Sequence, residues 1–172
     1  RKIQSRMGLS ASAEYVDEFL KEISTIWKKE NTEYRYQGKK VDAVLVDEAQ
    51  FLSEAEIDTL SDLVDFYNIP VICYGLRTDF RNRLFPGSRR LMEIADVIEE
   101  VPTVCWCGKR AQCNTRYANG EIVREGAQIM LGSNESYVAL CRKHYKEGKL
   151  WKEAGAENET STRRNCKIME KE

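Results

Sequence analysis

Hydrophobic and polar positions alternate along the chain in blocks that predict helices and strands in turn. Between residues 12 and 29, apolar side chains recur at helical spacing and charged side chains occupy the other face, which predicts an amphipathic helix. Residues 41–46 are almost all apolar, as expected for a strand that is buried on both faces of a parallel sheet. Ser53 and Glu56 form a capping box, a common start of a helix. An apolar run at 69–75 follows, so the region predicts a right-handed strand–helix–strand crossover.

The remaining segments divide the chain into three predicted parts. Residues 31–40 are polar and contain a glycine, which favours a loop, and another short helix is expected from residue 88 to about residue 95. Beyond it, short strands broken by glycines, with no helix before the tail, indicate a small β-rich module. We therefore expect an α/β core at 1–101, the β-rich module at 102–150, and a polar tail at 151–172 that is disordered or loosely helical.

Composition is that of a globular protein and argues against two classes of partner. Of the 172 residues, 42% are hydrophobic and 32% are charged, which is ordinary for a globular domain. A formal net charge of -1 argues against a dedicated nucleic-acid surface. No apolar run is long enough to cross a membrane, and the first ten residues lack the apolar core of a signal peptide. We therefore expect a cytoplasmic protein without a nucleic-acid or membrane partner.

Four of the six cysteines fall in the predicted β-rich module, which in a reducing compartment suggests metal binding before disulfides. Cys105 and Cys107 form one short pair, and Cys141 with His144 forms a second, so the four side chains predict a tetrahedral zinc site. The single residue between the first two cysteines makes a tight bite, and Cys113 is an alternative ligand. A site with four protein ligands would have a structural role, because it leaves no open position for catalysis.

An acidic pair, Asp47 and Glu48, ends the apolar run at 41–46. Ligands of open α/β sheets bind beyond the carboxyl ends of the strands. P-loop NTPases place a Mg²⁺-directed carboxylate after an apolar strand in this way. The pair therefore predicts either a nucleotide site or a solvated strand end.

Four blocks of sequence carry a resemblance to a known family. They are Asp-Glu-Ala-Gln-Phe-Leu at 47–52, Tyr-Gly-Leu-Arg-Thr-Asp-Phe at 74–80, Leu-Phe-Pro-Gly-Ser at 84–88 and Gly-Ser-Asn-Glu-Ser-Tyr at 132–137. In order and spacing, these blocks resemble the zinc-containing P-loop type of thymidine kinase. The resemblance covers roughly residues 5–145, far more than one short motif provides.

The resemblance implies a reaction and a set of site residues. Enzymes of the family transfer the γ-phosphate of ATP to the 5′-hydroxyl of thymidine or deoxyuridine, giving dTMP for DNA precursor salvage. Asp47 matches the carboxylate that supports Mg²⁺ through water, and Glu48 matches the general base that takes the proton of the hydroxyl. The residues that match the nucleoside pocket are Phe51, Leu76, Phe80, Phe85, Gly132 and Tyr137. Without the resemblance, Phe51, Leu76 and Phe80 would be assigned to the core.

The resemblance also implies the architecture and the partners. The fold class is expected to be α/β, with a P-loop (RecA-like) parallel sheet and a small zinc-binding β-rich domain whose loop covers the nucleoside. The family commonly has Cys-x-x-Cys where this chain has Cys105-Trp106-Cys107. A homotetramer and feedback inhibition by dTTP are further expectations.

A phosphate-binding loop ending in Gly-Lys-Ser or Gly-Lys-Thr does not occur in the 172 residues. In the family this loop lies upstream of the position of Arg1, so we expect a truncated kinase that does not phosphorylate thymidine by itself. One alternative is a non-catalytic relative that binds nucleosides and zinc. A helicase-like ATPase, suggested by Asp-Glu-Ala-Gln, is disfavoured by the small size and the absence of a basic track.

Overall fold

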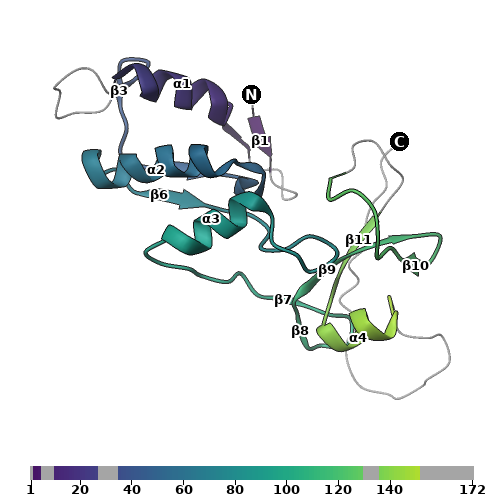
Figure 1. Cartoon of the computed structure of the whole chain (residues 1–172). Helices are drawn as coiled ribbons and strands as arrows, with labels where there is room; N and C mark the ends of the chain where they lie inside the picture. The colour runs from purple at the N-terminus through teal and green to yellow at the C-terminus, as the bar shows by residue number, and fades with distance from the viewer. Residues whose placement is uncertain (1, 5–9, 27–34, 130–135, 152–172) are drawn as a thin grey trace.

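The computed structural model describes residues 2–4, 10–26, 35–129 and 136–151, and shows a mixed α and β chain with several small sheets (Figure 1). Its elements in chain order are β1 (Lys2–Gln4), β2 (Ser10–Ser12), α1 (Val16–Ile26), β3 (Arg35–Tyr36), β4 (Lys39–Lys40), β5 (Val44–Val46), the 3₁₀ helix η1 (Ala49–Phe51), α2 (Glu54–Tyr67), β6 (Val71–Cys73), α3 (Pro86–Ile94), β7 (Thr103–Val104), β8 (Arg110–Ala111), β9 (Cys113–Ala118), β10 (Glu121–Ile122), β11 (Ser136–Leu140) and α4 (Arg142–Glu147). None of the described helices is long and apolar enough to span a membrane.

The strand–helix–strand crossover predicted from the sequence is confirmed. Strands β5 and β6 pair in parallel, with Val44 opposite Val71, and α2 connects them. The capping box is also present, because the Ser53 hydroxyl accepts a hydrogen bond from the Glu56 N–H and the Glu56 carboxylate accepts one from the Ser53 N–H. These paired contacts satisfy main-chain donors that the first turn of a helix leaves free.

The prediction that residues 41–46 are buried on both faces is wrong. Val46 is buried in a core that also contains Leu20 of α1 and Leu60 of α2, but Leu45 is 65% exposed. Its neighbour Ile72 in β6 is 46% exposed. The reason is that the helices of the described residues cover one face of this pair and leave the other open. Pairing of β5 or β6 with a further strand is not seen in the described ranges, so the larger P-loop sheet stays a prediction.

Two boundaries near the beginning of the chain differ from the sequence prediction. Helix α1 begins at Val16 rather than at residue 12, because residues 10–12 pair with β1 in an antiparallel ladder. The predicted loop at 31–40 is wrong for residues 35–40, which form the β3–β4 hairpin. Gln37 and Gly38 at its turn both have positive φ, the geometry that matches the twist of a two-residue hairpin. Residues 27–29 and 31–34 lie outside the described ranges.

Helix α3 begins at Pro86, two residues before the predicted start. Proline suits this position because its fixed φ is helical and its missing N–H has no partner in the first turn. The following Gly87 allows a close approach to η1, since a Cβ at this position would lie 2.6 Å from the Leu52 carbonyl oxygen. The beginning of α3 therefore packs directly on the main chain that follows the acidic pair.

A separate β-rich region follows, with β9 in the middle of an antiparallel sheet between β10 and β11 (Figure 1). Its buried cluster consists of Cys105, Ala111, Cys113, Leu140, Cys141, Tyr145 and Leu150. One helix was not predicted here, the short α4, which ends at Gly148 with φ 75°. Of the predicted tail, only Trp151 lies in the described ranges, and the domain boundary at residue 101 stays a prediction.

Candidate functional site

The acidic pair lies where the chain leaves the carboxyl end of β5. Both Asp47 and Glu48 are exposed, and the Asp47 carboxylate accepts a 2.9 Å hydrogen bond from the Glu48 N–H. Glu48 has φ 53° and ψ 35°, a left-handed conformation that is uncommon for a residue with a side chain. Such positions cluster at functional sites, where the surrounding structure holds them.

A buried glutamine holds this turn, and the sequence analysis did not identify it. Gln50 is 1% exposed, and its amide nitrogen donates to the Glu48 carboxylate. Its amide oxygen accepts a 3.0 Å hydrogen bond from the Leu76 N–H, at the end of the neighbouring strand. Gln50 thus connects the proposed catalytic carboxylate to the segment that carries Leu76. The only signal in the sequence was its place within the block at 47–52.

Three of the residues matched to the nucleoside pocket lie around this turn. Phe51 is 53% exposed and meets the buried Phe85 edge to face, with 5.7 Å between ring centroids and 85° between ring planes. Leu76 is 42% exposed, and its carbonyl oxygen accepts a 2.7 Å hydrogen bond from the Ser88 hydroxyl. Exposed apolar side chains beside an anchored carboxylate can cover the flat face of a ligand such as a base.

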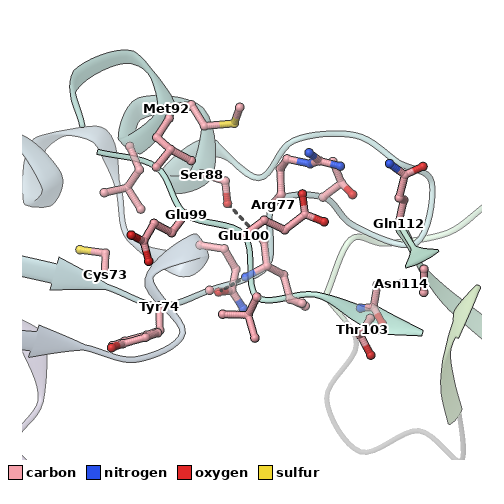
Figure 2. Close-up of a pocket in the computed structure, with 18 of the residues that line it drawn as sticks. Cys73, Tyr74, Arg77, Ser88, Met92, Glu99, Glu100, Thr103, Gln112 and Asn114 are labelled. Carbon is pink, nitrogen blue, oxygen red and sulfur yellow. Dashed lines mark hydrogen bonds between the residues drawn. The ribbon is translucent and has the colours of Figure 1, made fainter. Parts of the chain in front are cut away.

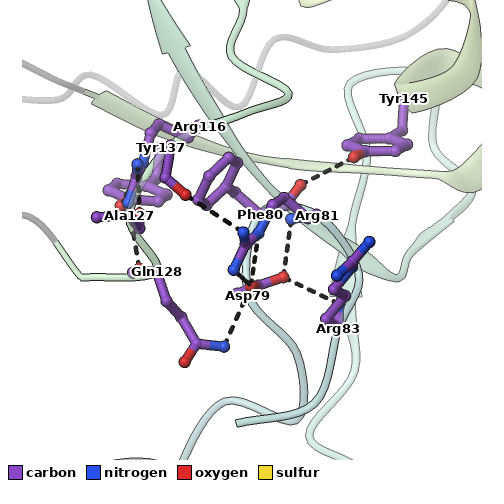
Figure 3. Close-up of polar contacts among 10 residues, drawn as sticks. Asp79, Phe80, Arg81, Arg83, Arg116, Ala127, Gln128, Tyr137 and Tyr145 are labelled. Carbon is purple, nitrogen blue, oxygen red and sulfur yellow. Dashed lines mark hydrogen bonds and ion pairs between the residues drawn. The ribbon is translucent and has the colours of Figure 1, made fainter.

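The other two described pocket residues, Phe80 and Tyr137, meet at an arginine that the sequence analysis missed (Figure 3). The Arg116 guanidinium lies 3.8 Å from the centre of the Phe80 ring, and its Nε donates a 2.9 Å hydrogen bond to the Tyr137 hydroxyl. Its two terminal nitrogens donate to the carbonyl oxygens of Ala127 and Gln128. Arg116 is fully buried. Sequence alone does not distinguish such an arginine from one on a surface.

The segment that carries Phe80 is organised by a buried carboxylate, Asp79. It accepts hydrogen bonds from the main-chain N–H groups of Arg81 and Arg83, from the Arg81 guanidinium and from the Gln128 amide. Burial by itself would raise the pKa of the Asp79 carboxyl, but the hydrogen bonds from Arg83, Arg81 and Gln128 outweigh it and hold the pKa below its ordinary value. The Asp79 carboxylate is therefore ionised at neutral pH, and both of its oxygens accept hydrogen bonds.

An open cavity of about 530 Å³ lies between segments 73–78, 98–101 and 111–114 (Figure 2). Leu76 lines this cavity, whereas Phe51, Phe80, Phe85 and Tyr137 do not. The structure therefore places the described pocket residues in two groups, one around Gln50 and one around Arg116, and only the first of these reaches the cavity. Gly132 lies outside the described ranges.

The four side chains predicted to bind zinc come together in the β-rich region. The ligand atoms of Cys105, Cys107, Cys141 and His144 all lie within 4.8 Å of one another, and Cys113 is not a member of this group. The Cys105 sulfur is 3.4 Å from His144 Nδ1, and the sulfurs of Cys107 and Cys141 are 4.0 Å apart. Ligand atoms around a tetrahedral ion with bonds of 2.0–2.3 Å are separated by roughly 3.5–3.8 Å. The cluster could therefore hold a metal ion.

Local structure explains how these ligands converge. The β7–β8 turn is closed by hydrogen bonds from the Cys105 N–H to the Lys109 carbonyl and from the Gly108 N–H to the Cys105 carbonyl. Cys141 precedes α4, and the His144 main-chain N–H at this helix start lowers the pKa of the Cys141 thiol. Burial raises the pKa of the Cys105 thiol, which favours its neutral form. The donor set suits a metal that prefers sulfur and nitrogen.

Comparison with known proteins finds one family across most of the chain. The thymidine kinase family model matches residues 1–145. Proteins named thymidine kinase from Haemophilus influenzae and Pasteurella multocida are 48% and 45% identical to this chain over 147 residues, which is 85% of this chain and 73% of each relative. A thymidine kinase from Legionella pneumophila (strain Paris) is 50% identical over 121 residues, 70% of this chain and 58% of the relative.

Proposed function

Because this chain belongs to the thymidine kinase family, we propose that it binds thymidine beside Glu48 and takes part in transferring the γ-phosphate of ATP to the nucleoside. The observation that carries the proposal is the anchored carboxylate: Gln50 holds Glu48 and Leu76 together at the carboxyl ends of two parallel strands. This is the edge at which open α/β sheets bind their ligands. The parallel pair also supports a P-loop type of core.

Each residue of the site has a proposed role. Glu48 accepts the proton of the 5′-hydroxyl as that oxygen attacks the γ-phosphorus, which increases its nucleophilicity. Asp47 contacts the water shell of Mg²⁺, the ion that would neutralise charge on the phosphates when bound. The proposed walls of the nucleoside site are Phe51, Leu76, Phe80, Phe85 and Tyr137, with Gly132 beside the base. The 172 residues hold no Gly-Lys-Ser/Thr loop, so the groups that bind the phosphates are not assigned.

The proposed metal of the Cys/His cluster is zinc, with a structural role. Its four protein ligands would be Cys105, Cys107, Cys141 and His144, which leaves no position for a reacting water. The zinc would connect the β7–β8 turn to the start of α4, two segments more than thirty residues apart in sequence. Inhibition by dTTP and assembly into a homotetramer are proposed from the family resemblance alone.

The experiment that tests the function is a calorimetric titration of the zinc-loaded chain with thymidine, with deoxycytidine as the control nucleoside. We expect saturable binding of thymidine and at least about tenfold weaker binding of deoxycytidine, a difference of about 1.4 kcal/mol. Equal binding of the two nucleosides, or binding of neither, would contradict the proposed site.

A second preparation distinguishes a kinase from a non-catalytic nucleoside-binding relative. A phosphate-binding loop of the family is joined to the chain, and transfer of radiolabelled γ-phosphate to thymidine is measured. Glu48→Gln keeps the shape of the side chain and is expected to lower kcat by about 10²- to 10⁴-fold with little change in thymidine affinity. An unchanged kcat would rule out Glu48 as the general base.

A further inference from the structure

The one residue between Cys105 and Cys107 is a tryptophan, and its ring lies on the histidine of the same cluster. The indole of Trp106 and the imidazole of His144 are stacked, with 4.0 Å between ring centroids and 7° between ring planes. The indole N–H donates a 3.3 Å hydrogen bond to the Lys149 carbonyl oxygen, which fixes the far edge of the ring. Trp106 is 39% exposed, so it forms the outer wall of the cluster.

The stacking fixes the plane in which the imidazole lies. His144 sits on the first turn of α4, and its Nδ1 is the ring nitrogen 3.4 Å from the Cys105 sulfur. A histidine ring can otherwise rotate about its side-chain bonds and present either nitrogen to a metal. A parallel indole at van der Waals distance prevents the imidazole from tilting out of its plane. The Lys149 N–H donates to the His144 carbonyl, so the same residue holds the Trp106 indole and the main chain of His144.

We propose that Trp106 is the positioning residue of the metal centre, holding the His144 ring in the plane in which its Nδ1 lies beside the Cys105 sulfur. This inference rests on the proposed metal site. This role of Trp106 also explains how two cysteines separated by one residue can both bind the metal. Cys105 and Cys107 turn toward the cluster, while Trp106 between them covers His144 from outside. Groups that orient metal ligands without touching the metal commonly change metal affinity by about 10- to 100-fold.

The test measures zinc affinity by competition with a chromophoric chelator. Trp106→Leu removes the aromatic ring and is expected to weaken zinc binding by about 10- to 100-fold. Trp106→Phe keeps a ring on His144 and is expected to stay within about threefold of wild type. The matched control is Trp151→Leu, because Trp151 is a 52% exposed tryptophan that touches Tyr117 in the same region and is not one of the cluster residues.

A second measurement reports the orientation of the His144 ring rather than the affinity for zinc. His144 is the only histidine, so its two ring nitrogens give an unambiguous ¹⁵N spectrum. In the zinc-loaded wild type, Nδ1 is expected to carry the metal-bound shift and Nε2 the proton. In Trp106→Leu the Nδ1 signal is expected to broaden, because the ring is no longer held in one plane. In a His144→Cys background there is no ring to orient, so Trp106→Leu should no longer change zinc affinity.

The outcomes distinguish the proposed metal site from the proposed role of Trp106. A wild-type chain that binds no zinc overturns the metal site and the role of Trp106 together. Zinc binding in which Trp106→Leu equals wild type, or loses the same affinity in the His144→Cys background, overturns the role of Trp106 alone. If Trp106→Leu does not fold, Trp106→Phe still decides, because a loss of more than about tenfold with the ring retained contradicts positioning by stacking.

Discussion

Two aromatic residues of the proposed nucleoside site are held by one buried arginine. Moving a charge out of water costs several kcal/mol unless hydrogen bonds replace the lost hydration. Arg116 donates to the Tyr137 hydroxyl and to two main-chain carbonyls, and its flat face lies on the Phe80 ring. Arg116 and Tyr137 also face each other in the β9–β11 pair. The planar guanidinium, rather than the charge alone, is what these contacts require.

We predict that Arg116→Lys lowers the free energy of unfolding by about 1–3 kcal/mol, because a lysine cannot reproduce the fork of donors. With Tyr137 and Phe80 released, the dissociation constant for thymidine should rise at least about tenfold. Urea unfolding and calorimetric titration of the zinc-loaded protein measure the two effects.

Arg90→Lys is the control for this prediction. Arg90 pairs with Asp58 and Glu93 on the partly exposed surface between α2 and α3, where an ion pair contributes about 1 kcal/mol or less. Arg90→Lys should leave thymidine binding unchanged. Equal effects of the two substitutions would show that Arg116 has no special part in the site.

At the scale of elements, the turn with the acidic pair depends on how closely α3 approaches η1. A Cβ on Gly87 would lie 2.6–2.9 Å from the carbonyl oxygens of Leu52, Ala49 and Gln50. All three are main-chain atoms, which cannot move aside as the end of a side chain can. Glycine is therefore required here for space.

Gly87→Ala is expected to destabilise the protein by about 2–3 kcal/mol through overpacking, although alanine is the better helix former. Urea unfolding provides the measurement. The comparison variant is Gly38→Asn at the hairpin turn, where a Cβ meets nothing within 4 Å and asparagine tolerates the positive φ. Its cost should stay below about 1 kcal/mol. A Gly87→Ala protein as stable as wild type would mean that α3 shifts freely on η1.

At the scale of the whole molecule, the loop that begins at Asp79 joins the α/β part to the β-rich region (Figure 3). Gln128 donates to Asp79, the Arg81 guanidinium donates to the Gly126 carbonyl, and the Tyr145 hydroxyl donates to the Phe80 carbonyl. The Asp79 carboxylate makes one of these contacts itself and binds the Arg81 guanidinium, which makes another. Its ionisation should therefore affect the stability of the connection between the two parts.

Asp79→Asn is expected to lower the free energy of unfolding at pH 7 by about 1–3 kcal/mol, because an amide presents donors to donors. The pKa of Asp79 is lower in the folded protein than its ordinary 3.8. The stabilisation is therefore fully present above pH 3.8 and is lost as the pH falls through the folded pKa.

Urea unfolding of wild type and variant between pH 7 and pH 3 measures this difference in stability. The difference should be constant at neutral pH and become smaller below about pH 4. Because acid also releases metal from the Cys/His cluster in both proteins, only the difference between them is interpreted. A difference that grows with acidity would contradict the assignment.

The sequence determined the features that depend on neighbouring residues. The capping box of Ser53 and Glu56 and the crossover of β5, α2 and β6 are encoded by residues close in the chain, and both predictions are confirmed. The blocks that matched a known family led to the family that the comparisons confirm. The close spacing of ligands identified the residues of the Cys/His cluster, whose ligand atoms do lie together.

Tertiary structure decided what depends on residues far apart. The hairpin at 35–40 and the open face of β5 were predicted wrongly, because local polarity does not show which segments pair or which face is covered. The sequence did not indicate the roles of Gln50, Arg116 and Trp106. Each of them contacts a partner 21 to 38 positions away, and only folding brings the two together. The sequence thus determined the chemistry of the groups, and folding decided which of those groups meet and in which orientation.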